Sequence, residues 1–390
     1  MAAEKLITLS DLYCQDLAEG SILVPEYPVS SVSTYRDGEP VKPFYQNDGG
    51  KYPMYDAFEI PKYQAFKFMK PQTHMAVCGD KLRVCTDYEV PTLLEGHWSN
   101  TLGRKTSVRY ATPSADTKCI TMFPYEHLTP EQHNVHPDNH YHVYSKYFIN
   151  EIPCAQARTL NLNQPQFPCV IKCAYGAGSK STFMCYNEED YREILEEFRS
   201  TEPGAPIVMT EMVPDVVDNY CCQFYLTKKG EMQWLGVSEQ LLGMDGLWMG
   251  GKMRQSEQPA LEDLLKPTLV PVAAKLHEWQ YSGVVGVDIL IDSEGKHYVI
   301  DINPRLNGST PMVLVSKVMG AQGWDAGIFL SGIKFQGTLA ELITAIENVN
   351  GGKMMLFGVY EAEGYLNCNI GVWGKTTPEA EEVFKQVFVV

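Results

Sequence analysis

The stretch YSGVVGVDILIDSEGKHYVIDINPRLNGST, residues 281–310, decides the fold of this chain, because it predicts two antiparallel strands joined by a turn. Residues 284–291 and 297–302 are apolar runs rich in β-branched side chains, and the DSEG sequence between them is typical of a turn. A hairpin folded about this turn places Asp288 opposite Asp301 on the neighbouring strand.

Three oxygen-bearing side chains converge in this hairpin. Asn303 lies two residues beyond Asp301 and therefore on the same face. Two carboxylates that face each other in an apolar sheet repel, unless a cation lies between them. Mg²⁺ prefers such all-oxygen sites and keeps positions open for phosphate oxygens. We therefore predict Asp288, Asp301 and Asn303 as metal ligands, with Arg305 as a fixed positive charge beside them. The alternative is a hairpin whose two acids face water.

Composition narrows the class of protein. The 390 residues are enough for two or three domains, and 44% hydrophobic with 21% charged residues indicates a globular chain. A formal net charge of -16 argues against nucleic-acid binding, which needs basic surface to neutralise phosphates. No signal-peptide pattern and no membrane-length apolar run is present, so we expect no membrane partner. Eleven scattered cysteines without a CxxC pair predict free thiols in a cytoplasmic protein.

The elements expected along the chain become regular only after residue 152. We expect an N-terminal domain without a recognisable motif, and then a histidine-rich segment, residues 125–144, that is a polar interdomain loop rather than a metal cluster. Residues 261–281 have helical periodicity, which we expect to be broken at Pro267 and Pro271. Further strands are expected at 167–172, 182–186, 207–213, 220–226, 232–240, 354–360 and 368–373, and further helices at 187–198, 339–348 and 377–387.

A glycine-rich loop, AYGAGSKST at residues 174–182, follows the strand that carries Lys172. Its backbone N–H groups, together with the Lys172 ammonium, could surround phosphates. A P-loop is excluded because Ser179 precedes Lys180 and a strand follows, and a dinucleotide fingerprint is excluded because Ser181 occupies its third position. We predict a flap that closes over a triphosphate; the alternative is an ordinary glycine-rich hairpin.

The order of the lysine strand, glycine loop, acid-bearing strand end and oxygen-ligand hairpin resembles the ATP-grasp superfamily over roughly residues 143–312. The resemblance implies an α/β fold of the α+β kind, in which two α/β subdomains clasp ATP and an N-terminal α/β domain precedes them. The expected ranges are 1–130 for the N-terminal domain, 131–210 for the lid subdomain and 211–390 for the C-terminal subdomain.

The same resemblance assigns residues to ATP. The lysines at 146 and 172 would contact phosphates, TEMV at 210–213 would hold adenine, and Asp218 or Asn219 would hold the ribose. The full set of expected ATP contacts is Lys146, Lys172, Gly176, Gly178, Ser179, Ser181, Glu211, Met212, Val213 and Asn219. Lys146 could instead be a surface lysine, and Glu211 could pair with a neighbouring base. One departure from the family is Asp301, where Glu is more frequent.

The resemblance also implies a reaction. ATP would phosphorylate a substrate carboxylate, with Arg305 and Lys172 as catalytic residues and Mg²⁺, or Mn²⁺ in its place, at the metal site. An amine would then attack the acyl phosphate to give an amide, ADP and phosphate, as in amino-acid or peptide ligases. In the segment 246–256 we expect a substrate loop in which Gly250 and Gly251 expose backbone donors and Lys252 with Arg254 clamps a substrate carboxylate; Arg305 is also expected to bind substrate. The alternative for this loop is a solvated surface turn.

Three competing functions share the fold. A small-molecule kinase would phosphorylate an alcohol, and a non-catalytic regulator would only bind ATP. A biotin-dependent carboxylase would need a carrier domain with a Met-Lys-Met-type lysine site, which we do not expect here. The presence of Asp288, Asp301, Asn303 and Arg305 together argues against the regulator. Small-molecule carboxylate and amine substrates are therefore expected as partners, and a homodimer is expected as the assembly.

Overall fold

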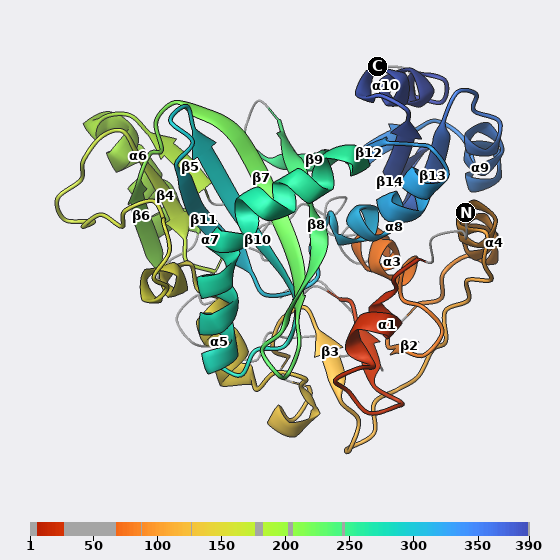
Figure 1. Ribbon diagram of the computed structural model, residues 1–390, viewed down its shortest axis with the longest axis horizontal. Helices are drawn as coiled ribbons and strands as arrows, with labels where there is room; N and C mark the ends of the chain where they lie inside the picture. Colours follow the sequence, from red (N-terminus) through yellow and green to blue (C-terminus); the bar gives the residue numbers. More distant parts are fainter. Residues whose placement is uncertain are drawn as a thin grey trace.

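The computed structural model describes residues 6–26, 68–86, 88–125, 127–175, 182–201, 206–243 and 246–388. These residues build three sheets, which Figure 1 shows as a central large sheet with a smaller sheet at one end and short strands beneath. The mixture of helices and sheets confirms the predicted α/β class of fold.

The N-terminal part holds a short parallel sheet in the order β2-β1-β3. Its strands are β1 (Ile22–Val24), β2 (Arg83–Val84) and β3 (Cys119–Thr121), and its helices are α1 (Leu9–Tyr13), α3 (Lys70–Met75) and α4 (Thr92–Leu102). A capping box between Thr8 and Asp11 begins α1, because each side chain satisfies a backbone N–H of the first turn.

The lid is an antiparallel sheet in the order β5-β4-β6, covered by one helix. Its elements are β4 (Cys169–Cys173), β5 (Thr182–Cys185), α6 (Glu188–Thr201) and β6 (Ile207–Glu211). Asn187 caps α6 as expected, since its Oδ1 accepts the N–H groups of Glu189 and Asp190 at 2.8 and 3.0 Å. Ile171, Phe198 and Met209 form a small core between the sheet and the helix.

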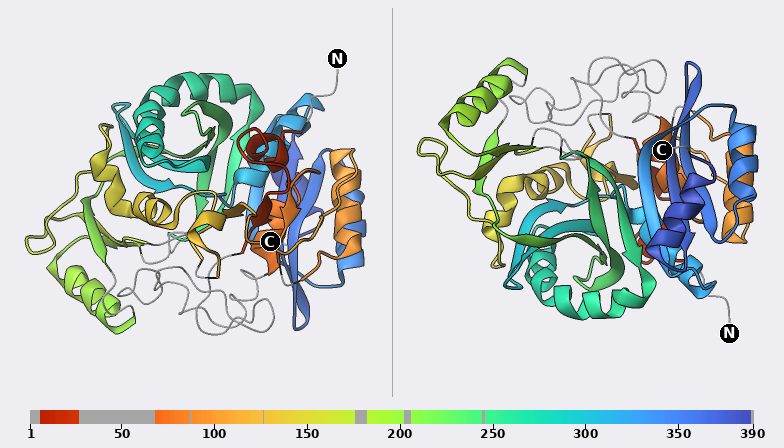
Figure 2. Two further views of the ribbon diagram at one scale, coloured as in Figure 1. Left: turned by 90° about the horizontal axis from the view of Figure 1, so that it is seen from below. Right: turned by 90° about the horizontal axis from the view of Figure 1, so that it is seen from above.

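An antiparallel eight-stranded sheet, in the order β11-β10-β7-β8-β9-β12-β14-β13, forms the rest of the molecule. Its strands are β7 (Val216–Leu226), β8 (Met232–Leu242), β9 (Trp248–Arg254), β10 (Gly283–Asp292), β11 (His297–Asn303), β12 (Ala326–Phe335), β13 (Lys353–Ala362) and β14 (Tyr365–Gly374). Its helices are α7 (Gln258–Glu278), α8 (Thr310–Ala321), α9 (Leu339–Glu347) and α10 (Thr377–Lys385). Figure 2 shows the lid at one end of this sheet and β13 with β14 at the other.

The expected break in α7 is wrong, because the helix continues through Pro267 and Pro271. Proline fixes φ near the helical value, so its cost in a helix is a missing hydrogen bond and local crowding. Leu269 and Val272 are fully buried against the β7–β10 strands, and this burial holds the helix together despite that cost.

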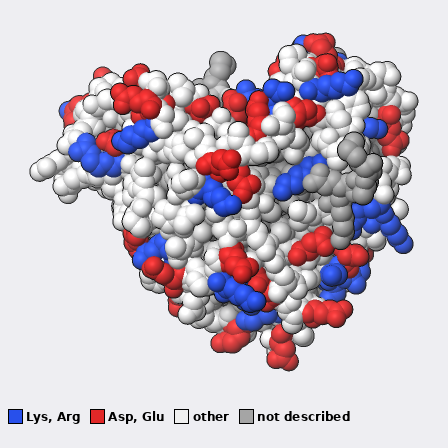
Figure 3. Space-filling model, viewed as in Figure 1, with Lys and Arg blue, Asp and Glu red and all other residues white. Residues whose placement is uncertain are grey.

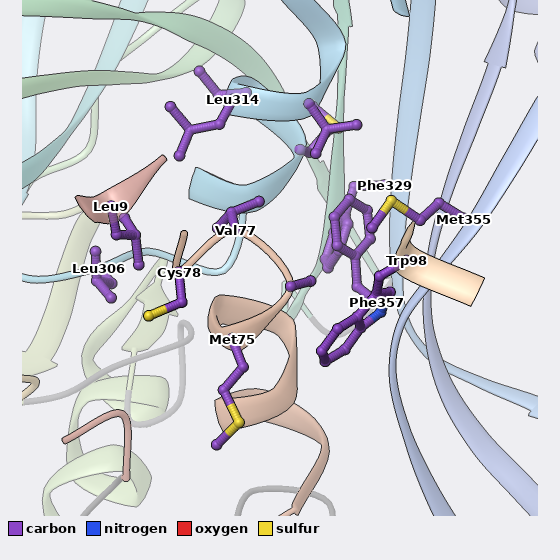
Figure 4. Close-up of a cluster of buried hydrophobic side chains, with 14 of the residues drawn as sticks. Leu9, Met75, Val77, Cys78, Trp98, Leu306, Leu314, Phe329, Met355 and Phe357 are labelled. Atoms are coloured by element: carbon purple, nitrogen blue, oxygen red, sulfur yellow. The ribbon is translucent and has the colours of Figure 1, made fainter. Parts of the chain in front are cut away.

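The N-terminal residues share a core with the C-terminal strands, which differs from the separate domain that we expected. Trp98 of α4 is buried beside Phe357 of β13, and its indole N–H donates to the Leu356 carbonyl at 2.8 Å (Figure 4). The Leu356 N–H in turn donates to His97 Nε2 at 3.0 Å. Chain segments more than 250 residues apart therefore share one packed core.

The histidine-rich segment is partly helical rather than a loop. It contains η4 (Pro130–Gln132) and α5 (Pro137–Tyr144), and η5 (Lys146–Glu151) follows. His133 and His140 are buried; His133 Nε2 accepts the Tyr125 N–H, and His140 Nε2 lies 2.9 Å from the Pro304 carbonyl oxygen. Both histidines therefore have a structural role, because their side chains make hydrogen bonds to the backbone. In the described part of the chain, no helix has the length and hydropathy needed to cross a membrane.

Candidate active site

The hairpin predicted from residues 281–310 is present, with Asp288 of β10 directly opposite Asp301 of β11. Asn303 lies on the same face, and its Nδ2 donates to Asp288 Oδ2 at 3.4 Å. Val287 and Ile289, the neighbours of Asp288, point to the opposite face, where they are buried under α7. Strand alternation therefore brings the three oxygen-bearing side chains together, and the predicted register is confirmed.

The two carboxylates repel each other. Burial, and then the negative charge of Asp301, raise the pKa of Asp288 from 3.8 to about 6. A divalent cation would relieve both effects, since it neutralises the pair and supplies the solvation that burial removes. The donor set of two carboxylates and one amide oxygen therefore fits Mg²⁺.

Two lysines approach the carboxylates from the side of the lid. Lys146, the first residue of η5, makes an ion pair of 2.6 Å with Asp301, and its side chain is 9% exposed. It is therefore not the surface lysine of the alternative interpretation. Lys172 of β4 is also buried, and its Nζ donates to the Ile300 carbonyl at 3.1 Å. Burial, and then the charge of Lys146, lower the pKa of Lys172 to about 8.

Arg305 lies just beyond the hairpin and is held on several sides. Its Nη2 donates to Asn303 Oδ1 at 2.8 Å, its Nη1 donates to the Leu306 carbonyl at 3.1 Å, and its Nε donates to the Tyr144 hydroxyl at 3.3 Å. Leu306 is 1% exposed in the main core, which fixes the backbone on that side (Figure 4). The guanidinium therefore has a defined direction beside the predicted metal ligands.

A layer of polar side chains lies behind the carboxylates, and the sequence alone did not predict it. Cys221 of β7 lies opposite Asp288, and its thiol donates to that carboxylate. The Ser309 hydroxyl supports the Cys221 sulfur, and Gln223 Nε2 donates to Ser309 Oγ at 2.8 Å. Burial raises the pKa of Cys221 well above its ordinary value. In the sequence, the only sign of this layer was the alternation of polar residues in β7, which does not show which side chains they contact.

The expected adenine segment lies where the lid joins the large sheet. The Glu211 carboxylate accepts hydrogen bonds from the Arg158 backbone N–H at 2.9 Å and from Arg158 Nε at 3.3 Å. Glu211 therefore pairs with a neighbouring basic residue, which is the alternative role that the sequence left open for it. The Met212 N–H donates to the Pro168 carbonyl at 3.4 Å, and the Val213 side chain packs against Tyr298. Their roles toward adenine stay predictions.

Asp218 and Asn219, the two residues predicted to hold the ribose, lie on opposite faces of the large sheet. Asn219 precedes Cys221 by two residues and therefore lies on the face of Asp288, where its Oδ1 accepts a hydrogen bond from Gln240. Asp218 lies on the α7 face, where the Tyr220 hydroxyl donates to it at 3.0 Å. The glycine-loop residues Gly176, Gly178, Ser179 and Ser181 lie outside the described residues.

The expected substrate loop at 246–256 is wrong, because most of it is β9, an interior strand between β8 and β12. Gly250 pairs with Leu330, and a Cβ at this position would lie 1.9 Å from the Phe329 oxygen. At Gly251 the fit is less severe but still tight, since a Cβ there would lie 3.2 Å from the backbone oxygen of Glu239. These glycines therefore allow strands to approach closely instead of exposing donors to a ligand.

Arg254 does not join Arg305. It lies two residues after Lys252, which pairs with Glu239 at 2.9 Å, so both cations lie on the α7 face of the sheet. Arg254 there pairs with Asp325 at 3.0 Å and with Glu257 at 3.1 Å. The predicted metal ligands lie on the other face, so Arg254 makes structural ion pairs.

Comparisons with known proteins agree with this geometry. Residues 151–303 match a family model described as L-aspartate–L-methionine ligase, ATP grasp. An N5-carboxyaminoimidazole ribonucleotide synthetase, solved as its ADP complex, is similar with a TM-score of 0.52 and 12% identity, over 80% of this chain and 92% of that chain. The biotin carboxylase domain of Hydrogenobacter thermophilus 2-oxoglutarate carboxylase, solved with MgADP, has a TM-score of 0.50 and 12% identity, over 78% of this chain and 73% of that chain.

Pyruvate carboxylase of Rhizobium etli is similar with a TM-score of 0.52 and 12% identity, over 78% of this chain. The present chain spans 30% of the length of that enzyme. At this level of identity the solved structures establish the fold, and the predicted ATP-grasp fold is confirmed.

Proposed function

We propose that this ATP-grasp ligase joins a carboxylate to an amine through an acyl phosphate and releases ADP and phosphate. The observation that carries the proposal is the convergence of two acids and three cations on one point from separate parts of the chain. Asp288 and Asp301 come from the hairpin, Arg305 from the loop after it, Lys146 from η5 and Lys172 from the lid. The family match makes L-aspartate and L-methionine the first acid and amine to test.

Each residue has a role that follows from its position. Mg²⁺, held by Asp288, Asp301 and Asn303, would neutralise phosphate oxygens and so favour transfer of the γ-phosphoryl group. Lys172 and Lys146 are buried ammonium groups that bind the phosphates through charge-assisted hydrogen bonds. The Arg305 guanidinium, fixed by Asn303 and Leu306, stabilises the charge that develops while the phosphoryl group moves to the carboxylate oxygen.

Formation of the amide requires that water be kept from the acyl phosphate. The flap over the nucleotide that the sequence of residues 174–182 predicts would serve this purpose, and it stays a prediction because residues 176–181 lie outside the described part of the chain. The amine then attacks the acyl carbon, the carbon–oxygen bond to phosphate breaks, and the amine loses one proton. The Val213 backbone and the cluster of Val213, Tyr298 and Ile300 are proposed to hold the adenine ring.

The test is an ADP-release assay with L-aspartate and L-methionine, followed by hydroxylamine trapping with the amine omitted. A ligase gives ADP and an aspartyl hydroxamate, and with both amino acids it gives a dipeptide. The Asp301→Asn variant is expected to lose nearly all turnover, whereas Asp263→Asn, the same change on exposed α7, keeps it. ADP formation with a stable phosphorylated alcohol and no hydroxamate would instead identify a kinase.

A further inference from the structure

A cavity of about 360 Å³ lies in the N-terminal part of the protein, and positively charged side chains gather around it. Arg104, Lys105 and Arg109, from the loop after α4, line this cavity, and Asp80, between α3 and β2, is the acidic residue among its lining side chains. Figures 1 and 2 show α4 and the lid at opposite ends of the molecule. No residue that lines the cavity belongs to the candidate active site, so the two are separate.

The three cations have no acidic partner in the described part of the chain. No ion pair and no side-chain hydrogen bond among the described residues involves Arg104, Lys105 or Arg109. Elsewhere a pair such as Arg254 with Asp325 is the rule, and Figure 3 shows acidic and basic side chains next to one another over much of one face. The chain as a whole carries a formal net charge of -16. Unpaired cations that gather in an acidic protein attract an anion, because the anion relieves their mutual repulsion.

The loop that carries these cations is held in place through its backbone. The Thr106 N–H donates to Ser99 Oγ of α4 at 2.9 Å. The Val84 N–H of β2 donates to the Arg109 carbonyl at 2.7 Å. Hydrogen bonds therefore fix the loop on both sides of Ser107, so little conformational entropy is lost when a ligand binds to it.

Two cations and a hydroxyl lie on the exposed side of this loop. Burial alternates along it, since Lys105, Ser107 and Arg109 are exposed and the residues between them are half-buried. Arg104, the residue before Lys105, is half-buried and lines the same cavity. A guanidinium donates paired hydrogen bonds to carboxylate or phosphate oxygens, and the ammonium and the hydroxyl supply further donors. The loop therefore presents a set of donors that suits an oxyanion.

The rest of the wall comes from the residue before α1 and the turn after α3. Gly79 in this turn has a φ of +85°, and a Cβ there would lie 2.4 Å from Thr8 Oγ1, so the two segments pack directly on each other. The Ser10 hydroxyl donates to the Cys78 carbonyl at 2.8 Å and holds the turn against α1. Asp80 follows on the same turn, so three positive charges and one negative charge leave the lining residues with a net charge of +2.

We propose that this basic cavity binds a small molecule that carries two or more phosphate or carboxylate groups. Two negative charges balance the net charge of the lining residues. The volume of about 360 Å³ lies at the small end of the range for ligand pockets, roughly 300–1,000 Å³, and therefore suits a compact polyanion. The inference goes beyond the proposed ligase activity and does not rest on it, because the cavity shares no residue with the candidate active site.

The experiment titrates pyrophosphate, and separately citrate, calorimetrically into the metal-free protein at low ionic strength, where exposed charges are screened least. Arg104→Gln with Arg109→Gln is expected to weaken binding by on the order of 100-fold, about tenfold for each charge-assisted hydrogen bond that is lost. The probe whose binding shows this loss identifies the ligand as a phosphate or a carboxylate compound. Binding of neither probe, or equal affinity in wild type and the folded double variant, overturns the inference.

The matched control is Lys229→Gln with Lys353→Gln. Both lysines are exposed and lie outside the cavity, so the control removes the same amount of positive charge from other parts of the surface. It is expected to keep the wild-type affinity for the probe. An equal loss in the control would mean that the probe responds to net charge alone, which would also overturn the inference. Thermal unfolding of both double variants shows that they are folded.

A third variant separates the cavity from the candidate active site, where we propose that lysines bind phosphates. Lys172→Ala removes a buried ammonium of that site. It is expected to retain the binding of pyrophosphate that Arg104→Gln with Arg109→Gln loses. The reverse result, a loss in Lys172→Ala and full binding in the double variant, would place the probe in the active site and overturn the inference. Because the measured quantity is binding, failure of the ligase proposal leaves this result unchanged.

Discussion

Replacing Asp288 by Asn should stabilise the metal-free protein while removing its response to Mg²⁺. Asn keeps the size of the side chain and can still accept the hydrogen bond from the Cys221 thiol. It removes the negative charge that faces Asp301 across the hairpin. The same change tests two statements at once, namely that the carboxylates repel each other and that the pair exists to hold a cation.

The magnitude follows from the pKa of Asp288, which burial and Asp301 raise from 3.8 to about 6. A rise of about two units corresponds to about 3 kcal/mol of cost for the ionised form above pH 7. Because the folded pKa is the higher one, the folded protein binds this proton more tightly than the unfolded chain. Metal-free wild type should therefore gain stability as the pH falls from about 7 to about 4, and Asp288→Asn should lack this contribution.

The assay is urea unfolding in chelator and then with increasing Mg²⁺. At pH 8 without metal, Asp288→Asn should exceed wild type in unfolding free energy by about 2–3 kcal/mol, the cost of the ionised carboxylate. Mg²⁺ at one hundred times its Kd should add about 2.7 kcal/mol to wild type and little to the variant. Asp263→Asn on exposed α7 serves as the control. Equal stability in chelator together with an equal response to Mg²⁺ would refute the reasoning.

Three further predictions concern the cations and the buried histidines. Lys172→Ala should weaken calorimetric binding of a non-hydrolysable ATP analogue by on the order of 2–4 kcal/mol, since a buried charge-assisted contact is lost; wild-type affinity would mean that Lys172 is structural. Arg305→Lys should lower kcat by about 100-fold with little change in the KM for ATP, and an unchanged steady-state kcat would contradict its role in the transition state. Burial lowers the pKa of His97 and of His133 to about 4. The contribution of each neutral histidine to the free energy of unfolding is therefore complete above about pH 6.5. It is lost as the pH falls toward 4, by up to about 1.4 kcal/mol per pH unit for each residue. Urea unfolding of His97→Gln from pH 7.5 to 4.5 should show a shallower loss than wild type, and identical slopes would count against this assignment.

Much of the central architecture was predictable because it depends on local sequence. The period-two alternation of residues 284–303 determines which side chains share a face, so the pattern alone was enough to place Asp288, Asp301 and Asn303 together. The strand ending near Lys172 and the capped α6 were predictable for the same reason. Strand β12 and helix α8 were missed, because α8 and the first half of β12 are buried and mostly apolar and therefore have no clear periodicity.

The errors arose where a residue's role depends on the elements that pack around it. The glycines at 250 and 251 are as compatible with a ligand loop as with a crowded strand, and only the positions of β8 and β12 decide between them. The prolines of α7 predict a break unless burial on the sheet offsets their cost. Asn219 and Asp218 are neighbours in sequence, and the packing of α7 against one face of β7 separates them.

The sequence by itself determined the β10–β11 hairpin, the strand of Lys172 and the class of fold, because strand alternation and turn chemistry act over a few residues. Only the tertiary structure decided that Lys146 pairs with Asp301 and that Cys221 supports Asp288. These pairs are separated by 67 and 155 residues, and no local preference specifies which distant side chains will meet. The long-range contacts follow from burying the apolar faces of the sheets and helices against one another, which brings the charged side chains at their edges into one site.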